Sequence, residues 1–240
     1  MELGNGGDAG SGGSVAVADR AGLVRIVEVW AHGWARARTH PVPRVVPGGL
    51  RIELGRPRDA VRYILPDPDP VALRDLDRTA AAPHTWIKVF APHAEVAPLL
   101  SPAWHHAGPQ YLMTAPMPPS SQVTPAPPGY RLDTEECDGI LDVRVWATGE
   151  AADRPAASGR AALIGGTGGA PLSAVFDMIT TEPEHRRRGL GRLVMTVLGI
   201  HAARRGASEG LLVATPSGRE LYASLGWCLR SPATEMVCKG

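Results

Sequence analysis

The chain has 240 residues, of which 44 % are hydrophobic, and its formal net charge at pH 7 is +1. This length suits one large domain or two small ones, and the apolar content is enough for a buried core, which argues against global disorder. The near-neutral charge argues against a dedicated nucleic-acid-binding protein, because such proteins usually carry a strongly basic face.

Cysteine usage and the absence of targeting patterns predict a cytoplasmic protein. Cys137, Cys228 and Cys238 are far apart and form no CxxC pair, so neither a zinc ribbon nor a redox dithiol is indicated. A reducing compartment is the simpler setting for them. The sequence shows no secretory signal and no run approaching the roughly 18 apolar residues that span a bilayer, so we expect no membrane partner.

The N-terminal half begins with a glycine-rich stretch, residues 1–14, which we expect to be a flexible tail. Residues 15–113 follow as a small α/β region. A helix over 21–37, with Asp19 as its cap, is predicted by an apolar stripe at steps of three and four: Leu23, Ile26, Val27, Trp30 and Trp34. Three strands and two short helices are predicted after it, the strands over 50–54, 61–65 and 85–90 and the helices over 71–80 and 94–100.

Residues 114–129 contain six prolines. Proline fixes φ and removes a backbone donor, so we expect no regular element there and interpret the segment as a linker. It separates the N-terminal half from a C-terminal domain over 130–240.

The C-terminal domain shows the clearer patterns. Strands are predicted over 130–135, 140–146 and 159–164, followed by a glycine-rich hairpin loop at 165–169 and a mostly apolar, central strand at 174–180. A helix over 189–205 carries an apolar stripe formed by Leu190, Leu193, Val194, Val197, Leu198 and Ala202. A strand at 210–214, a helix at 218–225 and an extended piece from 227 complete the domain.

The loop that leads into the helix over 189–205 reads Glu-Pro-Glu-His-Arg-Arg-Arg-Gly-Leu-Gly-Arg over residues 182–192. A helix N-terminus offers unpaired backbone N–H groups and a positive dipole end, so it binds phosphate groups. Glycines let an anion approach the backbone, and arginines add charge-assisted hydrogen bonds. A pyrophosphate fits this site, whereas the spacings of a P-loop and of a dinucleotide fold are both absent.

Two motifs in this half resemble the GNAT superfamily of acetyl-CoA-dependent N-acetyltransferases. The pattern Arg186-x-x-Gly189-x-Gly191 is similar to the family's acetyl-CoA signature, and Thr181-x-Pro183 resembles its usual lead-in with threonine in the valine position. A second motif, similar to the family's LYxxLGF with tryptophan for phenylalanine, follows at the right distance: Leu221-Tyr222-x-x-Leu225-Gly226-Trp227. The resemblance covers about residues 130–240.

The resemblance implies an α/β fold with a mixed, mostly antiparallel sheet flanked by helices, to which the N-terminal α/β half over 15–113 is an addition or a degenerate relative of the same fold. Acetyl-CoA would be the co-substrate and no metal would be needed. The pantetheine arm would lie between the fourth and fifth strands, beside backbone groups of Ile179 and Thr181. The loop would hold the pyrophosphate through Arg186, Arg187, Arg188, Gly189, Leu190, Gly191 and Arg192.

The implied reaction is direct attack of a primary amine on acetyl-CoA in a ternary complex. Only about one part in a thousand of an alkylamine is neutral at pH 7, so a general base would help. Asp177 is the acid near the middle of the fourth strand, whereas many family members carry a glutamate nearby, where this chain has Ser173 and Val175. The base is therefore Asp177, a residue of the N-terminal half, or solvent, and Tyr222 is the expected proton donor to the thiolate.

A second departure concerns the acceptor site. Family members usually have two helices between strands one and two, but the first two predicted strands here are joined by only a few residues. We hypothesise that residues 15–113 build the acceptor groove instead. A truncated chain from about Pro125 that acetylated the physiological substrate at the full-length rate would contradict this.

Other interpretations of the same residues remain open. The chain could be a non-catalytic acyl-CoA-binding regulatory module, or the arginines could serve an interaction domain whose binding falls steeply with salt. The histidines at 84, 93, 105 and 106 lack metal-site spacing, so we expect no metal. The sequence does not name the acceptor amine. It also leaves the oligomeric state open, although homodimers are common in such proteins.

Overall fold

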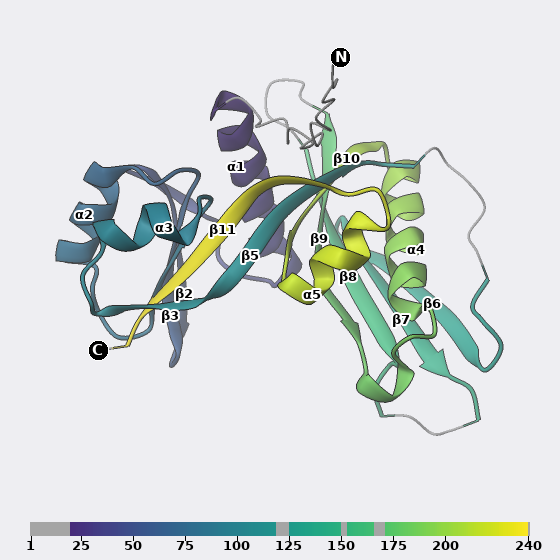
Figure 1. The fold of residues 1–240 in the computed structure, drawn as a ribbon. Coiled ribbons are helices and arrows are strands. Elements are labelled where there is room, and N and C mark those ends of the chain that lie inside the picture. The colour runs from purple at the N-terminus through teal and green to yellow at the C-terminus, as the bar shows by residue number, and fades with distance from the viewer. Residues whose placement is uncertain (1–19, 119–124, 150–152, 166–170, 240) are drawn as a thin grey trace, which may run out of the picture.

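The computed structural model describes residues 20–118, 125–149, 153–165 and 171–239. Within them a single sheet of 11 strands runs through the molecule in the order β1-β2-β3-β4-β11-β5-β10-β9-β8-β7-β6 (Figure 1). Most neighbouring strands are antiparallel, with parallel pairs at β3–β4 and β9–β10. Helices flank this sheet, so the predicted fold class is confirmed. The expected tail 1–14, the cap Asp19 and most of the glycine-rich loop lie outside the described residues.

The N-terminal half has the elements that the sequence predicts, with two additional strands. The helices are α1 (Arg20–Ala37), α2 (Pro70–Thr79), α3 (His93–Val96) and the 3₁₀ turn η1 (Ala97–Leu99), and the strands are β1 (Arg44–Val46), β2 (Gly49–Arg56), β3 (Asp59–Leu65), β4 (Thr85–Val89) and β5 (Trp104–Pro116). Strand β1 was not predicted, and neither was β5. Strand β5 extends to Pro116, so the first three residues of the expected linker at 114–129 belong to a strand.

The C-terminal half follows the predicted order closely. Its strands are β6 (Tyr130–Cys137), β7 (Ile140–Ala147), β8 (Ala157–Ile164), β9 (Leu172–Thr181), β10 (Ala207–Ala214) and β11 (Cys228–Cys238), and its helical elements are η3 (Pro183–His185), α4 (Leu190–Arg204) and α5 (Pro216–Ala223). The predicted extended piece at 227–229 is the start of β11, which continues for 11 residues.

The two halves exchange strands. Strand β11, from the end of the chain, lies between β4 and β5 of the N-terminal half, and β5 in turn pairs with β10 of the C-terminal half. Each half thus completes the sheet of the other, as the crossing ribbons at the centre of Figure 1 show. A truncated chain from Pro125 would lose β5, which lies between two strands that it keeps, so point variants are the better test of the N-terminal half.

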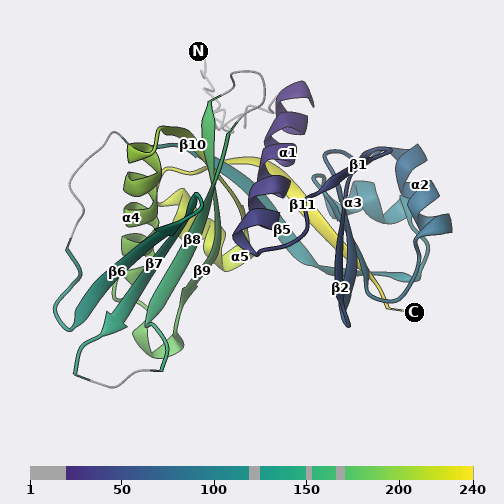
Figure 2. The same ribbon diagram turned by 180° about the vertical axis from the view of Figure 1, so that it is seen from behind.

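Helix α1 belongs to the N-terminal half but covers the sheet of the C-terminal half (Figure 2). Side chains of β9 alternate between faces: Ala174 and Phe176 pack in the core beneath α4, and Val175 packs in the core with α1 on the other side. Gly33 lies so close that a Cβ there would be 2.2 Å from the Cγ2 atom of Val175. Since β6 and β7 are joined only by residues 138–139, α1 occupies a face that this short connection leaves open.

Candidate functional site

The parallel strands β9 and β10 separate halfway along their length. Their pairing ends at Val175 and Leu211, although β9 continues to Thr181 and β10 continues to Ala214, where it pairs with Tyr111 of β5. Beyond Val175 the edge of β9 that faces β10 is therefore open. At the split Met178 adopts a φ of 56°, which is uncommon for a residue with a side chain and marks strained backbone.

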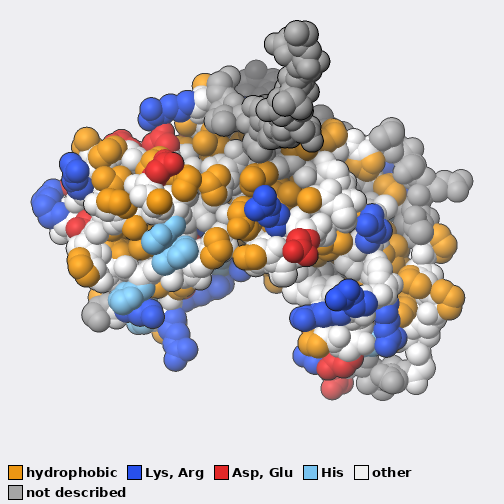
Figure 3. All heavy atoms as spheres, viewed as in Figure 1, with side chains coloured by type: hydrophobic (Ala, Val, Ile, Leu, Met, Phe, Trp, Pro, Cys, Tyr) orange, Lys and Arg blue, Asp and Glu red, His pale blue; other side chains and the backbone are white. Residues whose placement is uncertain are grey.

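A cavity of about 420 Å³ lies at this split and extends between the two halves. The C-terminal half contributes β9, β10 and Tyr222 of α5, and the N-terminal half contributes α1, β3, β4 and β5. Figure 3 shows that the molecular surface is hollowed between the halves. The cavity thus brings together three of the predicted site residues, Asp177, Ile179 and Tyr222.

Tyr222 reaches the cavity from the short helix α5. The helix begins at Pro216 with Thr215 as its cap, whose Oγ1 accepts a hydrogen bond from the Gly218 amide at 3.2 Å. The ring packs beside Trp227, and only 9 % of the residue is exposed. Burial, and then the negative charge of Asp177, raise the pKa of Tyr222 to about 12. The hydroxyl therefore carries its proton throughout the neutral range.

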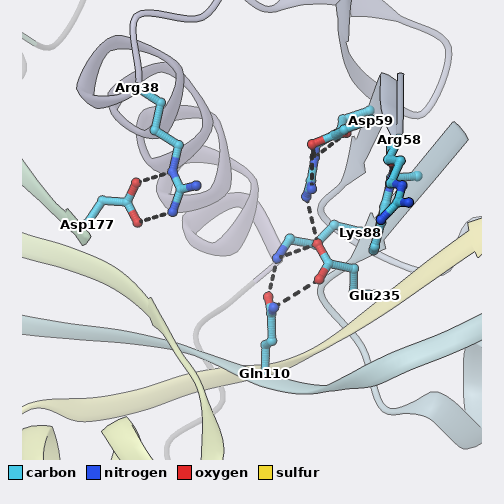
Figure 4. Close-up of polar contacts among 9 residues, drawn as sticks. Arg38, Arg58, Asp59, Lys88, Gln110, Asp177 and Glu235 are labelled. Atoms are coloured by element: carbon cyan, nitrogen blue, oxygen red, sulfur yellow. Dashed lines mark hydrogen bonds and ion pairs between the residues drawn. The ribbon is translucent and has the colours of Figure 1, made fainter. Parts of the chain in front are cut away.

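Asp177 is held by Arg38, which follows the end of α1. The guanidinium donates two hydrogen bonds, from Nε to Oδ2 at 2.5 Å and from Nη2 to Oδ1 at 3.0 Å (Figure 4). These bonds to the carboxylate raise the pKa of Arg38, against the opposing effect of burial. The pair joins the N-terminal helix to β9 at the point where β9 leaves β10. Sequence reasoning missed Arg38, which lies in the turn after α1, four residues beyond Trp34 of the apolar stripe.

The arginine loop lies beyond the end of β9 and leads into α4. Gly189, with φ 77°, is the cap of α4, and Arg187 has φ 61°. A cap without a side-chain acceptor leaves the first amides of α4 available to an anion. Gly191 lies close to Thr181, since a Cβ there would be 3.5 Å from the threonine Oγ1. The loop and the split strand therefore form one continuous surface.

Three of the loop arginines are held by contacts with neighbouring residues. Nε of Arg186 donates to the carbonyl of Thr181 at 3.2 Å. Arg188 donates to the Tyr130 hydroxyl at 3.0 Å, and Arg192 donates to the Ser224 hydroxyl at 3.1 Å. These contacts orient positive charge around the start of α4, and Figure 3 shows basic side chains gathered on this face of the C-terminal half.

The N-terminal half contains another parallel strand–helix–strand crossover, β3–α2–β4, which lacks the basic loop of the β9–α4–β10 crossover. Its strands β3 and β4 stay paired from Val61–Thr85 to Leu65–Val89, and they are joined by α2 as β9 and β10 are joined by α4. The loop before α2 reads Pro-Asp-Pro-Asp over 66–69, and Asp69 caps the first amides of the helix with its own carboxylate. Proline offers no N–H, and the aspartates repel anions. In the described part of the chain only the β9–α4–β10 crossover has both the split and the basic loop.

A largely buried network of polar and charged side chains forms one wall of the cavity. Lys88 Nζ lies 3.2 Å from Glu235 Oε1, which also accepts from Arg62 Nη1 at 2.8 Å. Gln110 donates to the other Glu235 oxygen at 3.0 Å and accepts from Lys88, and Asp59 binds Arg62 (Figure 4). Burial lowers the pKa of Lys88 despite its pairing with Glu235. Burial opposes ionisation of Glu235, but Lys88 and Arg62 hold its pKa below the ordinary value.

Sequence reasoning missed this network because its members come from four strands, β3, β4, β11 and β5, and β11 is inserted between β4 and β5 only by the strand exchange. Lys88 faces Glu235 in the β4–β11 register, for instance. Within the described residues we find no group of three or more potential metal ligands, and no helix that is long and apolar enough to cross a membrane.

Comparison with solved structures identifies this fold over nearly the whole chain. A GCN5-related N-acetyltransferase from Kribbella flavida matches with a TM-score of 0.63 at 16 % identity, covering 91 % of this chain and 96 % of its own. A protein assigned to the GNAT family from Novosphingobium aromaticivorans gives 0.53 at 20 % identity, covering 90 % and 98 %. A GCN5-related N-acetyltransferase from Sphaerobacter thermophilus gives 0.50 at 12 % identity, covering 92 % and 96 %.

No protein-family model and no curated protein matches the sequence. At these identities the structural matches establish the fold. They confirm the resemblance to the GNAT superfamily at that level. Because they cover at least 90 % of the chain, the shared fold includes the N-terminal half as well as the half that carries the motifs.

Proposed function

We propose that this chain, which has the fold of the GNAT superfamily, is an N-acetyltransferase that moves acetyl from acetyl-CoA to a primary amine in a ternary complex. The observation that carries the proposal is the split between β9 and β10. It lies beside Tyr222 and next to the glycine- and arginine-rich loop that leads into α4. The same split is missing from the N-terminal crossover, so it is not a general consequence of this connectivity.

The proposed cofactor position follows from the unpaired edge of β9. The amide-containing pantetheine arm would add to that edge like a short strand, beside the backbone of Ile179 and Thr181. The pyrophosphate would lie on the amides of the loop and of the first turn of α4, from Arg187 to Arg192, with Arg186 and Arg188 adding charge-assisted hydrogen bonds. Because Gly191 has no side chain, the anion can approach the backbone there.

The proposed chemistry uses groups that share the cavity. The acceptor ammonium gives a proton to Asp177, directly or through water, and the neutral amine attacks the thioester carbonyl. Backbone donors at the split stabilise the oxyanion. When the C–S bond breaks, Tyr222 donates its proton to the departing thiolate, and the proton that the acylated nitrogen releases returns to the phenolate through solvent. The pKa of about 12 keeps Tyr222 protonated at neutral pH, so that the donor is in place when the thiolate forms.

Direct transfer is favoured over an acyl-enzyme because no cysteine lines the cavity within the described residues. Cys137 and Cys228 are exposed and Cys238 is buried elsewhere in the sheet. All three are free thiols, which agrees with the reducing cytoplasm that we propose as the location.

The test is release of CoA thiol from acetyl-CoA in the presence of a panel of amines, with product masses confirming N-acetylation. We expect Tyr222→Phe to lower kcat by about 10- to 100-fold without changing acetyl-CoA affinity, since it removes one proton donor. Tyr111→Phe is the matched control, because Tyr111 is also partly buried but does not line the cavity. An unchanged kcat in Tyr222→Phe would favour a role for the chain as an acyl-CoA-binding regulatory module.

A further inference from the structure

We infer that the acceptor is a free α-amino acid, whose carboxylate binds Arg38 while its ammonium group binds Asp177. This inference rests on the proposed function and names the substrate class of the same cavity. It starts from the ion pair between Arg38 and Asp177, which lines the cavity and joins the turn after α1 to the split strand.

The Arg38–Asp177 pair is within reach of a ligand, unlike the inner network, by which we mean the buried network around Lys88 and Glu235. The side chains of Arg38 and Asp177 are 38 % and 17 % exposed, whereas those of Lys88 and Glu235 are 9 % and 11 % exposed. The guanidinium also lies over the Trp34 ring, 5.5 Å from its centre, which limits its movement. The Arg38 fork is therefore fixed in place and accessible to a planar anion that replaces the Asp177 carboxylate.

The inner network is already complete and leaves no vacancy for a charged ligand. Glu235 accepts from Lys88, Arg62 and Gln110, and Arg62 is further occupied by Asp59. Breaking any of these contacts would leave a buried charge without its partner, which is costly. The network is thus a rigid polar wall, and the recognition of a charged acceptor falls to Arg38 and Asp177.

The opposite charges of Arg38 and Asp177 then determine which class of acceptor fits. A ligand with only a carboxylate would displace Asp177 and leave that acid unpaired, and a ligand with only an ammonium group would leave Arg38 unpaired. A zwitterion satisfies both residues. Its carboxylate replaces Asp177 as the partner of Arg38, and its ammonium group replaces Arg38 as the partner of Asp177. A protein N-terminus or a lysine side chain carries no carboxylate on the amine-bearing carbon, so neither meets this requirement.

The position of Asp177 also suits the amine. Asp177 precedes Met178, whose φ of 56° marks the split, and Ile179 follows on the same open edge. An ammonium group bound to Asp177 therefore lies within two residues of the backbone proposed to hold the thioester. Displacement by the ligand carboxylate would also release Asp177 from Arg38 and leave it free to accept the proton.

The experiment compares matched trios of acceptors with the full-length protein and acetyl-CoA. Each trio holds a free amino acid, its carboxamide and the corresponding decarboxylated amine, with alanine, phenylalanine and lysine as the parents. We expect kcat/KM to be about 10- to 100-fold higher for the free acid than for its carboxamide in at least one trio, because a bidentate charge-assisted contact is lost. The carboxamide amine loses its proton at least as easily, so amine acidity cannot produce this order.

Substitutions test whether Arg38 is the source of the preference. Arg38→Ala is expected to bring the acid-to-carboxamide ratio close to one, and Arg38→Lys to restore part of it. Arg25→Ala is the matched control, because Arg25 makes a similar two-bond pair with Glu209, from α1 to β10, outside the cavity. That variant should keep the wild-type ratio, whereas a purely structural role of Arg38 would leave the ratio unchanged in Arg38→Ala as well.

The outcomes separate this inference from the proposed function. Acetylation of carboxamides or simple amines at the rate of the free acids would overturn the acceptor class and leave the acetyltransferase standing. Binding of acetyl-CoA without acetylation of any free amino acid in the panel would also overturn it. Failure to bind acetyl-CoA would instead contradict the proposed function itself.

Discussion

Replacing Gly33 with alanine tests how α1 docks on the C-terminal half. The added Cβ would lie 2.2 Å from Cγ2 and 2.4 Å from Cβ of Val175, a stiff and fully buried side chain. Overpacking of this kind costs about 1–3 kcal/mol, and contact with the Cβ atom places Gly33→Ala in the upper part of that range. Alanine recovers up to about 1 kcal/mol through helix propensity, so we expect a net loss of about 1–2 kcal/mol.

Urea unfolding of four proteins measures this effect: wild type, Gly33→Ala, Val175→Ala and the double variant. The double variant should lose about 1–2 kcal/mol less stability than the sum of the two single losses, because the new methyl group fills the space that Val175 leaves. Gly199→Ala in α4 is the control, since its Cβ would meet the Pro118 ring at an ordinary 3.5 Å and should stabilise. If Gly33→Ala stabilises the protein as much as Gly199→Ala does, α1 does not pack on β9 as described.

Two further predictions concern buried ionisable groups. Lys88→Met should destabilise the protein by about 3–5 kcal/mol, because it leaves Glu235 buried beside Arg62 with less compensation, and the double variant with Glu235→Leu should recover much of that loss in the same unfolding assay. Tyr222 keeps its proton to about pH 12 in the folded state but only to about pH 10 when unfolded, so the folded state loses stability as pH rises. Between pH 9 and 11 this amounts to about 1 kcal/mol, which Tyr222→Phe should not show; equal losses in both proteins would contradict the raised pKa.

The elements of the C-terminal half were predictable because their patterns are local. The apolar stripe of α4 and the β-rich run of β9 each bury one defined face, so periodicity alone finds them. The loop before α4 was predictable for the same reason, since its glycines and arginines are adjacent in sequence. The proposed role of these residues in binding the cofactor stays a prediction, which calorimetric titration with acetyl-CoA can test.

Strand β5 and the strand exchange could not be predicted in this way. The first half of β5 is largely exposed and contains Gly108 and Pro109, so neither alternation nor an apolar run marks it. Its partners, β10 and β11, lie 100 residues or more along the chain for most pairs, and no local pattern specifies such pairing. The polar wall of Lys88, Gln110 and Glu235 depends on that exchange and was missed with it.

The expected linker shows a similar limit. Its prolines indicated a break from residue 114, yet Pro116 ends β5 within the sheet. The N-terminal half was expected to shape the acceptor site, and the cavity lining agrees with that proposal, since Arg38, Lys88 and Gln110 come from it. The N-terminal half is attached through the exchanged strands β5 and β11 and through α1, which packs on β8 and β9. This packing is visible only in the three-dimensional structure.

Calorimetric titration of the full-length protein with acetyl-CoA tests the cofactor site most directly. The account predicts saturable binding that is weakened by Arg188→Ala, which removes a charge beside the start of α4, and weakened further by Gly191→Glu, which adds bulk and negative charge there. Arg205→Ala, at the opposite end of α4, should bind like wild type. No binding by the wild type, or equal binding by all four proteins, would contradict the claim that this loop and the split strand hold the cofactor.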